Sequence, residues 1–181
     1  MIDNTERHAA LKALESANTE TDIWEFLPHP DGYVRVLAIE KLNRFASQQS
    51  IKLAAILIND NNEHVVEAAS NLLSHIGGAE SVAILFRALK STQLERPCFI
   101  ANALAQMGEA GFNSLKQCVL SENPNVRYYA ARGIGSSNFN EASEILEHLV
   151  LTDHEKTTFD GLVSTAARKA LKTLDRNKGN E

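Results

Sequence analysis

Apolar residues recur along the chain at intervals of three and four, the spacing that places them on one face of an α-helix. Two series of these residues also repeat every 31 positions, a period typical of stacked helical hairpins. The first series comprises Leu27, Ile58, Leu89, Leu120 and Leu151, and the second comprises Leu11, Leu42, Leu73 and Leu104. The two series stay in phase over most of the chain, so they indicate a true repeat and not a chance alignment of leucines.

Short polar segments follow the apolar ones, at residues 28–32, 59–63, 91–93, 121–125 and 152–156. Their Asp, Asn, Pro and Gly residues end one helix and cap the next, which predicts antiparallel hairpins. We therefore expect an all-α fold, a right-handed α-α superhelix of five hairpins in a single domain, residues 1–181. Its predicted parts are a capping helix at about 4–17, repeats at about 19–46, 50–77, 79–108, 110–136 and 140–175, and a tail at 176–181.

The second helix of a pair opens with a valine and carries an alanine four positions later. The pairs are Val34 with Ala38, Val65 with Ala69, Val126 with Ala130, and Val163 with Ala167. Such an alanine lets two helix backbones approach closely. The third repeat departs from this pattern, with Arg96 and Ile100 at these positions and Pro97 suited only to a first turn. The last hairpin loop, about 152–161, is predicted to be longer than the others.

These turn and helix residues resemble a known repeat. Pro30-Asp31-Gly32-Tyr33-Val34-Arg35 with Ala38 and Leu42, and Asn123-Pro124-Asn125-Val126-Arg127, are similar to the signature of HEAT repeats, particularly the short ones of phycobilisome bilin lyases. In that family the aspartate before the second helix and the arginine within it form a polar ladder between repeats. The resemblance implies a ladder of Asp31, Arg35, Asn62, Asn123 and Arg127, which Val66 and Pro97 interrupt.

Charge and targeting signals restrict the partners. The net charge is −5 and the pI about 5.7, so the overall field repels phosphate backbones and predicts no nucleic-acid partner. The chain shows no signal peptide and no apolar run of the roughly 18 residues that span a bilayer, which predicts a cytoplasmic protein with no membrane partner. Cys98 and Cys118 lack the number and spacing of a disulfide framework or metal site.

No pattern of catalytic residues stands out. Gly77-Gly78 and Gly133-Ile134-Gly135 fall at or near predicted helix ends, where glycine is a common cap, and not in a phosphate-binding loop. The histidines are scattered over different repeats. HEAT-type hydroxylases bind iron through paired His-Glu dipeptides, but only His154-Glu155 reads that way, and it lies in the long loop. We therefore predict no catalytic residue, no metal, no cofactor and no enzymatic activity.

Binding is expected on the second helices, which line the concave side of HEAT-like arrays. The predicted partner-contact residues are Glu40, Arg44, Glu67, Asn71, His75, Asn102, Gln106, Tyr128 and Arg132. Tyrosine and arginine are frequent binding hot spots, and Asn71 and Asn102 could bond a peptide backbone, as in armadillo arrays. The leading hypothesis is an adaptor, scaffold or inhibitor module that holds another protein.

Two alternatives remain open. The likeness to bilin-lyase repeats implies a protein that handles a chromophore or another small molecule, with Tyr128, Arg132 and Cys98 around a pocket. A HEAT-like DNA-alkylation repair protein would need a basic, aromatic-rich concave face, against which the acidic charge argues. Trp24 is expected in the core.

Overall fold

The computed structural model describes residues 4–91, 97–158 and 160–178. Within these ranges it contains eleven helices and no β-strand. The expected all-α fold is confirmed, and within each of its two compact units consecutive hairpins stack as in a helical solenoid. The chain divides into two compact units, Met1–Ile76 and Gly77–Glu181. A single domain and a right-handed superhelical turn of the whole array stay predictions.

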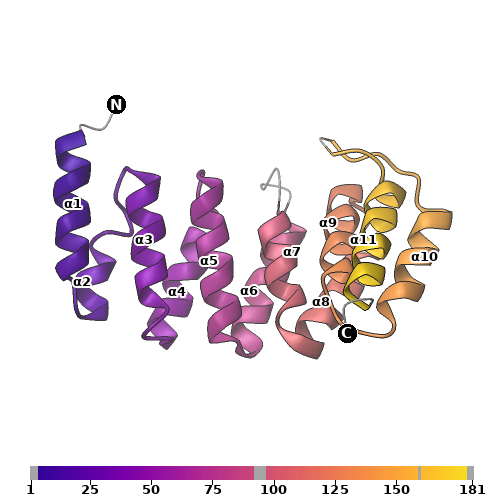
Figure 1. Ribbon diagram of the computed structural model, residues 1–181, viewed down its shortest axis with the longest axis horizontal. Coiled ribbons are helices and arrows are strands. Elements are labelled where there is room, and N and C mark those ends of the chain that lie inside the picture. The colour runs from indigo at the N-terminus through magenta and orange to yellow at the C-terminus, as the bar shows by residue number, and fades with distance from the viewer. Residues whose placement is uncertain (1–3, 92–96, 159, 179–181) are drawn as a thin grey trace. The chain divides into compact units, whose positions relative to one another are not determined.

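The first unit contains a leading helix and two helix pairs. They are α1 (Asn4–Ser16), α2 (Glu20–Trp24), α3 (Gly32–Leu42), α4 (Gln48–Leu57) and α5 (Glu63–Ile76). The helices α2 and α4 each pack on the second helix of their own pair, α3 and α5. The second helices also pack on one another, and α1 covers the free side of α3 (Figure 1). The predicted capping helix is thus confirmed.

The second unit contains three helix pairs. They are α6 (Gly78–Lys90) with α7 (Cys98–Ala105), α8 (Gly108–Cys118) with α9 (Pro124–Gly135), and α10 (Ala142–Thr152) with α11 (Val163–Lys178). The second helices form a row, α7 against α9 and α9 against α11 (Figure 1). Because α11 continues to Lys178, the tail predicted from residue 176 is wrong in its start. Arg96, and Thr92 and Gln93 of the predicted turn at 91–93, lie outside the described residues.

Residues at the helix starts explain where each hairpin turns. Thr19 caps α2 in a capping box with Asp22, and the Ser47 hydroxyl accepts from the first backbone N–H groups of α4. Asn123 caps α9, with Pro124 in the first turn, where its missing N–H costs nothing. Pro97, predicted in a first turn, is the residue directly before α7.

The predicted valine and alanine positions form the core of the second-helix layer. Val34, Val65 and Val163 are fully buried, Val126 is 3% exposed, and all four partner alanines are fully buried. Leu42, Leu73 and Leu104 of the second 31-residue series are also fully buried. The close-packing interpretation of this pattern is therefore confirmed.

The first leucine series loses its register in the second unit. Leu27, Ile58 and Leu89 are buried, but Leu120 is 83% exposed and Leu151 is 75% exposed. The buried series is instead Ile23, Ala54, Leu85, Leu115 and Leu146, in which the step from Leu85 to Leu115 is 30 residues (115 − 85). One residue turns a helical position by about 100°, so the 31-residue count places Leu120 and Leu151 outside the core.

Two glycine pairs behave differently from one another. Gly77 and Gly78 have φ values of 74° and 80°, which agrees with the predicted cap after α5. Gly133 and Gly135 instead lie inside the last turn of α9, where the cap interpretation is wrong. A Cβ at Gly135 would stand 2.7 Å from the Cα of Ala170, so this glycine permits close contact between α9 and α11.

The long loop between α10 and α11 is held against α9. Its backbone closes on itself through Thr157, whose N–H donates to the Gly161 carbonyl at 2.8 Å. The Thr158 N–H donates to Asn125 Oδ1 at 3.0 Å, and the Tyr129 hydroxyl donates to Asp160. The predicted extra length of this loop is confirmed, and these bonds attach it to the fourth repeat.

Candidate functional site

An arginine clamp joins the two repeats of the first unit. Arg35, on α3, is 9% exposed. Its Nε donates to Asp60 Oδ2 at 3.0 Å and its Nη2 donates to Asp60 Oδ1 at 2.7 Å. Its Nη1 donates to the carbonyls of His29 at 2.6 Å and Pro30 at 3.1 Å. Asp60 precedes α5, so this bidentate, charge-assisted pair holds neighbouring hairpins together.

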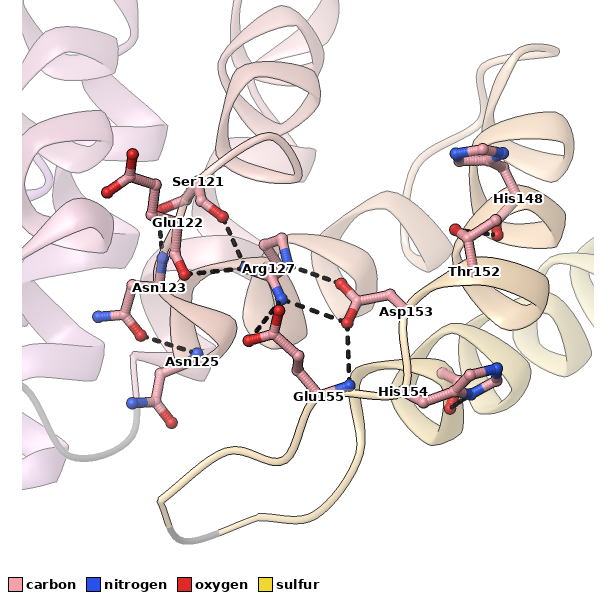
Figure 2. Close-up of polar contacts among 11 residues, drawn as sticks. Ser121, Glu122, Asn123, Asn125, Arg127, His148, Thr152, Asp153, His154 and Glu155 are labelled. Atoms are coloured by element: carbon pink, nitrogen blue, oxygen red, sulfur yellow. Dashed lines mark hydrogen bonds and ion pairs between the residues drawn. The ribbon is translucent and has the colours of Figure 1, made fainter.

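The second unit repeats the same clamp with different residues. Arg127 Nε donates to Asp153 Oδ2 at 2.6 Å and Nη2 donates to Oδ1 at 3.2 Å, while Nη1 donates to the carbonyls of Ser121 and Glu122. Figure 2 shows the guanidinium between the α8–α9 turn and Asp153. Glu155 Oε2 adds an ion pair at 3.4 Å. Hydrogen bonds to Asp153 raise the pKa of Arg127 above its ordinary value, against the opposing effect of burial.

The ladder implied by the family resemblance is therefore correct in its arginines and wrong in its acceptors. Asp31, Asn62 and Asn123 cap helices, accepting from the N–H groups two residues later at 2.8, 3.0 and 2.9 Å. The carboxylates that bind the arginines are Asp60 and Asp153, which the sequence reasoning missed. A signal existed, because these aspartates follow Arg35 and Arg127 by 25 and 26 residues. Val66 occupies the arginine position in the second repeat and is buried.

Three of the predicted contact residues meet in one groove of the first unit. This α3–α5 groove has a volume of about 500 Å³ and is lined by Gly32, Tyr33, Val36, Glu40, Asn62, His64, Glu67, Ala68 and Asn71. Glu40 and Asn71 are exposed, and the Glu67 side chain is 41% exposed. A Cβ at Gly32 would meet Asn62 Nδ2 at 2.2 Å, so a larger residue where α3 begins would displace the Asn62 side chain that caps α5.

The other predicted contact residues lie apart from this groove. Arg44 stacks on Phe45 and donates to the Ala17 carbonyl at 3.0 Å, and His75 is exposed in the last turn of α5. In the second unit Asn102, Gln106 and Arg132 are exposed on α7, at its C-terminal cap and on α9.

Tyr128 is wrongly placed by the prediction, because it is only 6% exposed. Its ring packs edge-on against Tyr129, which is 1% exposed. Burial raises the pKa of Tyr129 well above its ordinary value, and the hydrogen bond to Asp160 acts in the same direction. Neither tyrosine offers the exposed aromatic surface that a binding hot spot needs. The hypothesised ligand pocket around Tyr128, Arg132 and Cys98 therefore lacks an exposed aromatic side chain.

Two further grooves lie between first helices, one in each unit. The α2–α4 groove, about 640 Å³, is mostly apolar, and its lining includes Trp24 and both side chains of the Arg35–Asp60 clamp. Trp24 was expected in the core and is only half-buried. The lining of the α8–α10 groove, about 850 Å³, likewise includes the Arg127–Asp153 clamp.

The described residues form neither a cluster of metal ligands nor a membrane-spanning helix. Within residues 4–91, 97–158 and 160–178, no three His, Cys, Asp or Glu side chains converge as metal ligands would. In the same part of the chain, no helix combines the length and apolarity needed to cross a bilayer.

Comparisons with known proteins bear on the repeat. Residues 20–96 match a family model described as HEAT repeats. An engineered protein solved by the Northeast Structural Genomics Consortium is 21% identical, covering 93% of this chain and 84% of that one, with a TM-score of 0.40. A designed armadillo repeat protein is 17% identical, covering 91% and 85%, with a TM-score of 0.39. The search of curated proteins found no match. The match identifies HEAT repeats within residues 20–96 of the chain.

Proposed function

We propose that the chain is a non-enzymatic protein-binding module whose α3–α5 groove holds an extended, basic segment of another protein. The observation that carries this proposal is the composition of the groove. Two carboxylates, Glu40 and Glu67, stand beside an exposed aromatic ring, Tyr33, and an exposed amide, Asn71. In this groove a lysine or arginine could pair with Glu40 or Glu67, and the amide of Asn71 could bond the extended backbone beside it.

The charge of the first unit favours such a partner. Residues 1–76 contain eleven acidic and six basic residues, a net charge of −5, whereas residues 77–181 contain twelve of each. The whole net charge of the chain therefore belongs to the unit that contains the groove. A field of this sign raises the association rate of basic segments and repels acidic ones.

An internal side chain already illustrates the proposed recognition. Arg7, from α1, lies over the Tyr33 ring with its guanidinium carbon 4.9 Å from the ring centroid. The same guanidinium pairs with Asp31 at 3.3 Å. A partner arginine could use the same ring and a neighbouring carboxylate in this way. The amide of Asn71 can both donate to and accept from a peptide backbone, which suits an extended segment.

The test compares charge reversal inside and outside the groove. Wild type, the double variant Glu40→Lys/Glu67→Lys and the control Glu15→Lys/Glu25→Lys would each serve as bait in extracts of the native host. The control changes two exposed glutamates of the same unit by the same charge. We expect a stoichiometric partner that wild type and control retain and the groove variant loses, with affinity falling about tenfold or more.

Two results would contradict the proposal. One is equal retention of that partner by the groove variant and the control, which would place binding elsewhere. The other is a partner whose binding segment, mapped with overlapping peptides, lacks lysine and arginine. Asn71→Ala should weaken binding of the same segment without changing its salt dependence, because the amide carries no charge.

From the composition and the motifs we also propose that the protein binds no nucleic acid, lies in the cytoplasm and has no enzymatic activity. For the chromophore-handling alternative, a colour change on mixing with bilins would be the supporting result, but none of the three grooves described above is lined by Tyr128, Arg132 or Cys98.

A further inference from the structure

The α8–α10 groove is a gap in the first-helix layer of the second unit. α6 packs against α8, whereas α10 packs on α9 and α11. The space of about 850 Å³ left between α8 and α10 is within the range of roughly 300–1,000 Å³ that ligand pockets occupy. Its apolar lining comes from Val119, Leu120, Ile145 and Leu149. Leu120 is 83% exposed, so a large aliphatic side chain at the edge of this gap is left in water.

The polar groups around this groove divide into satisfied and available ones. Arg127 is fully engaged by its clamp, so an occupant needs no polar group to match it. Lys116 pairs with Glu141 at 2.9 Å. Glu144 is exposed on α10, and Glu155, which pairs with Arg127 at 3.4 Å, keeps a side chain that is 67% exposed. Among the lining residues, four carboxylates face two permanent cations, which leaves a net negative rim when both histidines are neutral.

The walls also determine which backbone conformation fits. The lining comes from α8 and α10, Arg127 of α9, the turn after α8 and the start of the long loop, and the helices satisfy their own backbone hydrogen bonds. An extended segment lying there would leave its N–H and C=O groups without main-chain partners, and the lining has no amide side chain, such as Asn71 of the α3–α5 groove, to replace them. A helix brings its backbone bonds with it and presents only side chains, as amphipathic helices do in apolar grooves.

We propose that the α8–α10 groove binds an amphipathic, basic helix of a partner protein. An aliphatic side chain of that helix packs on Leu120 and Ile145, and a lysine or arginine about one turn away reaches Glu144 or Glu155. This site lies in the second unit and is independent of the α3–α5 groove, since it differs in lining, in location and in the conformation of its occupant.

The test uses a synthetic amphipathic peptide of about 14 residues, near the shortest length at which an isolated helix is stable. One face carries leucines at helical spacing and the other carries lysines; a matched peptide has glutamate for every lysine. Fluorescence anisotropy gives the affinities, and amide shifts in ¹H–¹⁵N spectra locate the site. We expect the lysine peptide to bind and to shift amides of α8, α10 and the 153–155 segment.

Matched variants separate the groove from general attraction between charges. Leu120→Asn should weaken binding about tenfold, because it replaces an apolar side chain with a polar amide of similar size. Leu151→Asn is its control, since Leu151 is 75% exposed and does not line the groove. Glu144→Lys should weaken binding more than Glu147→Lys, a neighbouring exposed position on α10 outside the lining.

Either of two peptide results would overturn this inference: no binding of the lysine peptide at about 1 mM, the weak end of measurable affinity, or equal affinity of the glutamate peptide. Equal effects of Leu120→Asn and Leu151→Asn on binding would also overturn it. So would amide shifts confined to α3 and α5. The last result would leave the proposed function in place while removing this second site. Because Leu120 and Glu144 are both exposed, their variants keep the core unchanged.

Discussion

The arginine clamps should contribute more to stability than surface ion pairs do. At both clamps the arginine and aspartate side chains are only 10–12% exposed. Removing one partner of such a pair leaves the other charge buried, a change that costs about 3–5 kcal/mol in proteins where the pair is fully enclosed. In Asp60→Ala, Arg35 would keep only its two carbonyl acceptors, and we expect the free energy of unfolding to fall by about 3 kcal/mol.

The two clamps differ in the number of carboxylates that pair with the arginine. Arg127 has a second carboxylate, Glu155, at 3.4 Å, and it can take over part of the interaction when Asp153 is replaced. We therefore expect Asp153→Ala to cost less than Asp60→Ala, about 2 kcal/mol. For a chain of this length each kcal/mol lowers Tm by about 2–4 °C, so the losses are easily measured.

The assay is urea denaturation followed by far-UV circular dichroism, with amide hydrogen exchange to assign each loss to its unit. Glu25→Ala, at an exposed position, serves as the control and should change the unfolding free energy by less than about 0.5 kcal/mol. A double-mutant cycle of Arg35→Met with Asp60→Ala isolates the pair. Losses below about 1 kcal/mol at both aspartates, the range of exposed ion pairs, would refute the reasoning.

Three further predictions concern buried groups. Burial raises the pKa of Tyr129 above the ordinary value of about 10. The stability that its neutral phenol contributes is therefore complete below about pH 10 and is lost as pH rises toward the folded-state pKa. Between about pH 9 and 11 the wild-type denaturation midpoint should fall more than that of Tyr129→Phe. Burial raises the pKa of Cys118 to about 12, so in folded Cys98→Ser iodoacetamide should leave it unmodified at about pH 8, and early labelling would contradict its burial. Ala69→Leu and Ala130→Leu should each destabilise by about 1–3 kcal/mol, and unchanged melting would mean that the hairpin packing is misassigned.

The repeat itself could be predicted from local patterns. Helical periodicity, the turn residues and the valine–alanine spacing depend on positions close together in the chain, and the hairpins follow directly from them. The predicted exposed positions Glu40, Glu67 and Asn71 fell into one groove because a constant repeat places equivalent residues side by side. These features could be predicted because each hairpin repeats the same short-range pattern of apolar, turn and capping residues.

Contacts between repeats could not be read in the same way. The choice of Asp60 over Asn62 as the partner of Arg35 depends on which residue of a turn faces the neighbouring hairpin. Tyr128 is buried because it packs against Tyr129 beside the long loop, although its position in the repeat suggested an exposed one.

The sequence by itself determined the all-α hairpin repeat, its turns and the acidic charge of the first unit, because periodicity, capping and charge are properties of nearby residues. Tertiary structure decided which side chains close the clamps and which leucines leave the core. A single-residue change in spacing, from 31 to 30 between Leu85 and Leu115, rotates every later position by about 100° and thereby exposes Leu120. The sequence shows a 30-residue step in this region, but only the packed helices show which leucines it exposes, because hydrophobicity alone does not distinguish a leucine in the core from one beside an open groove.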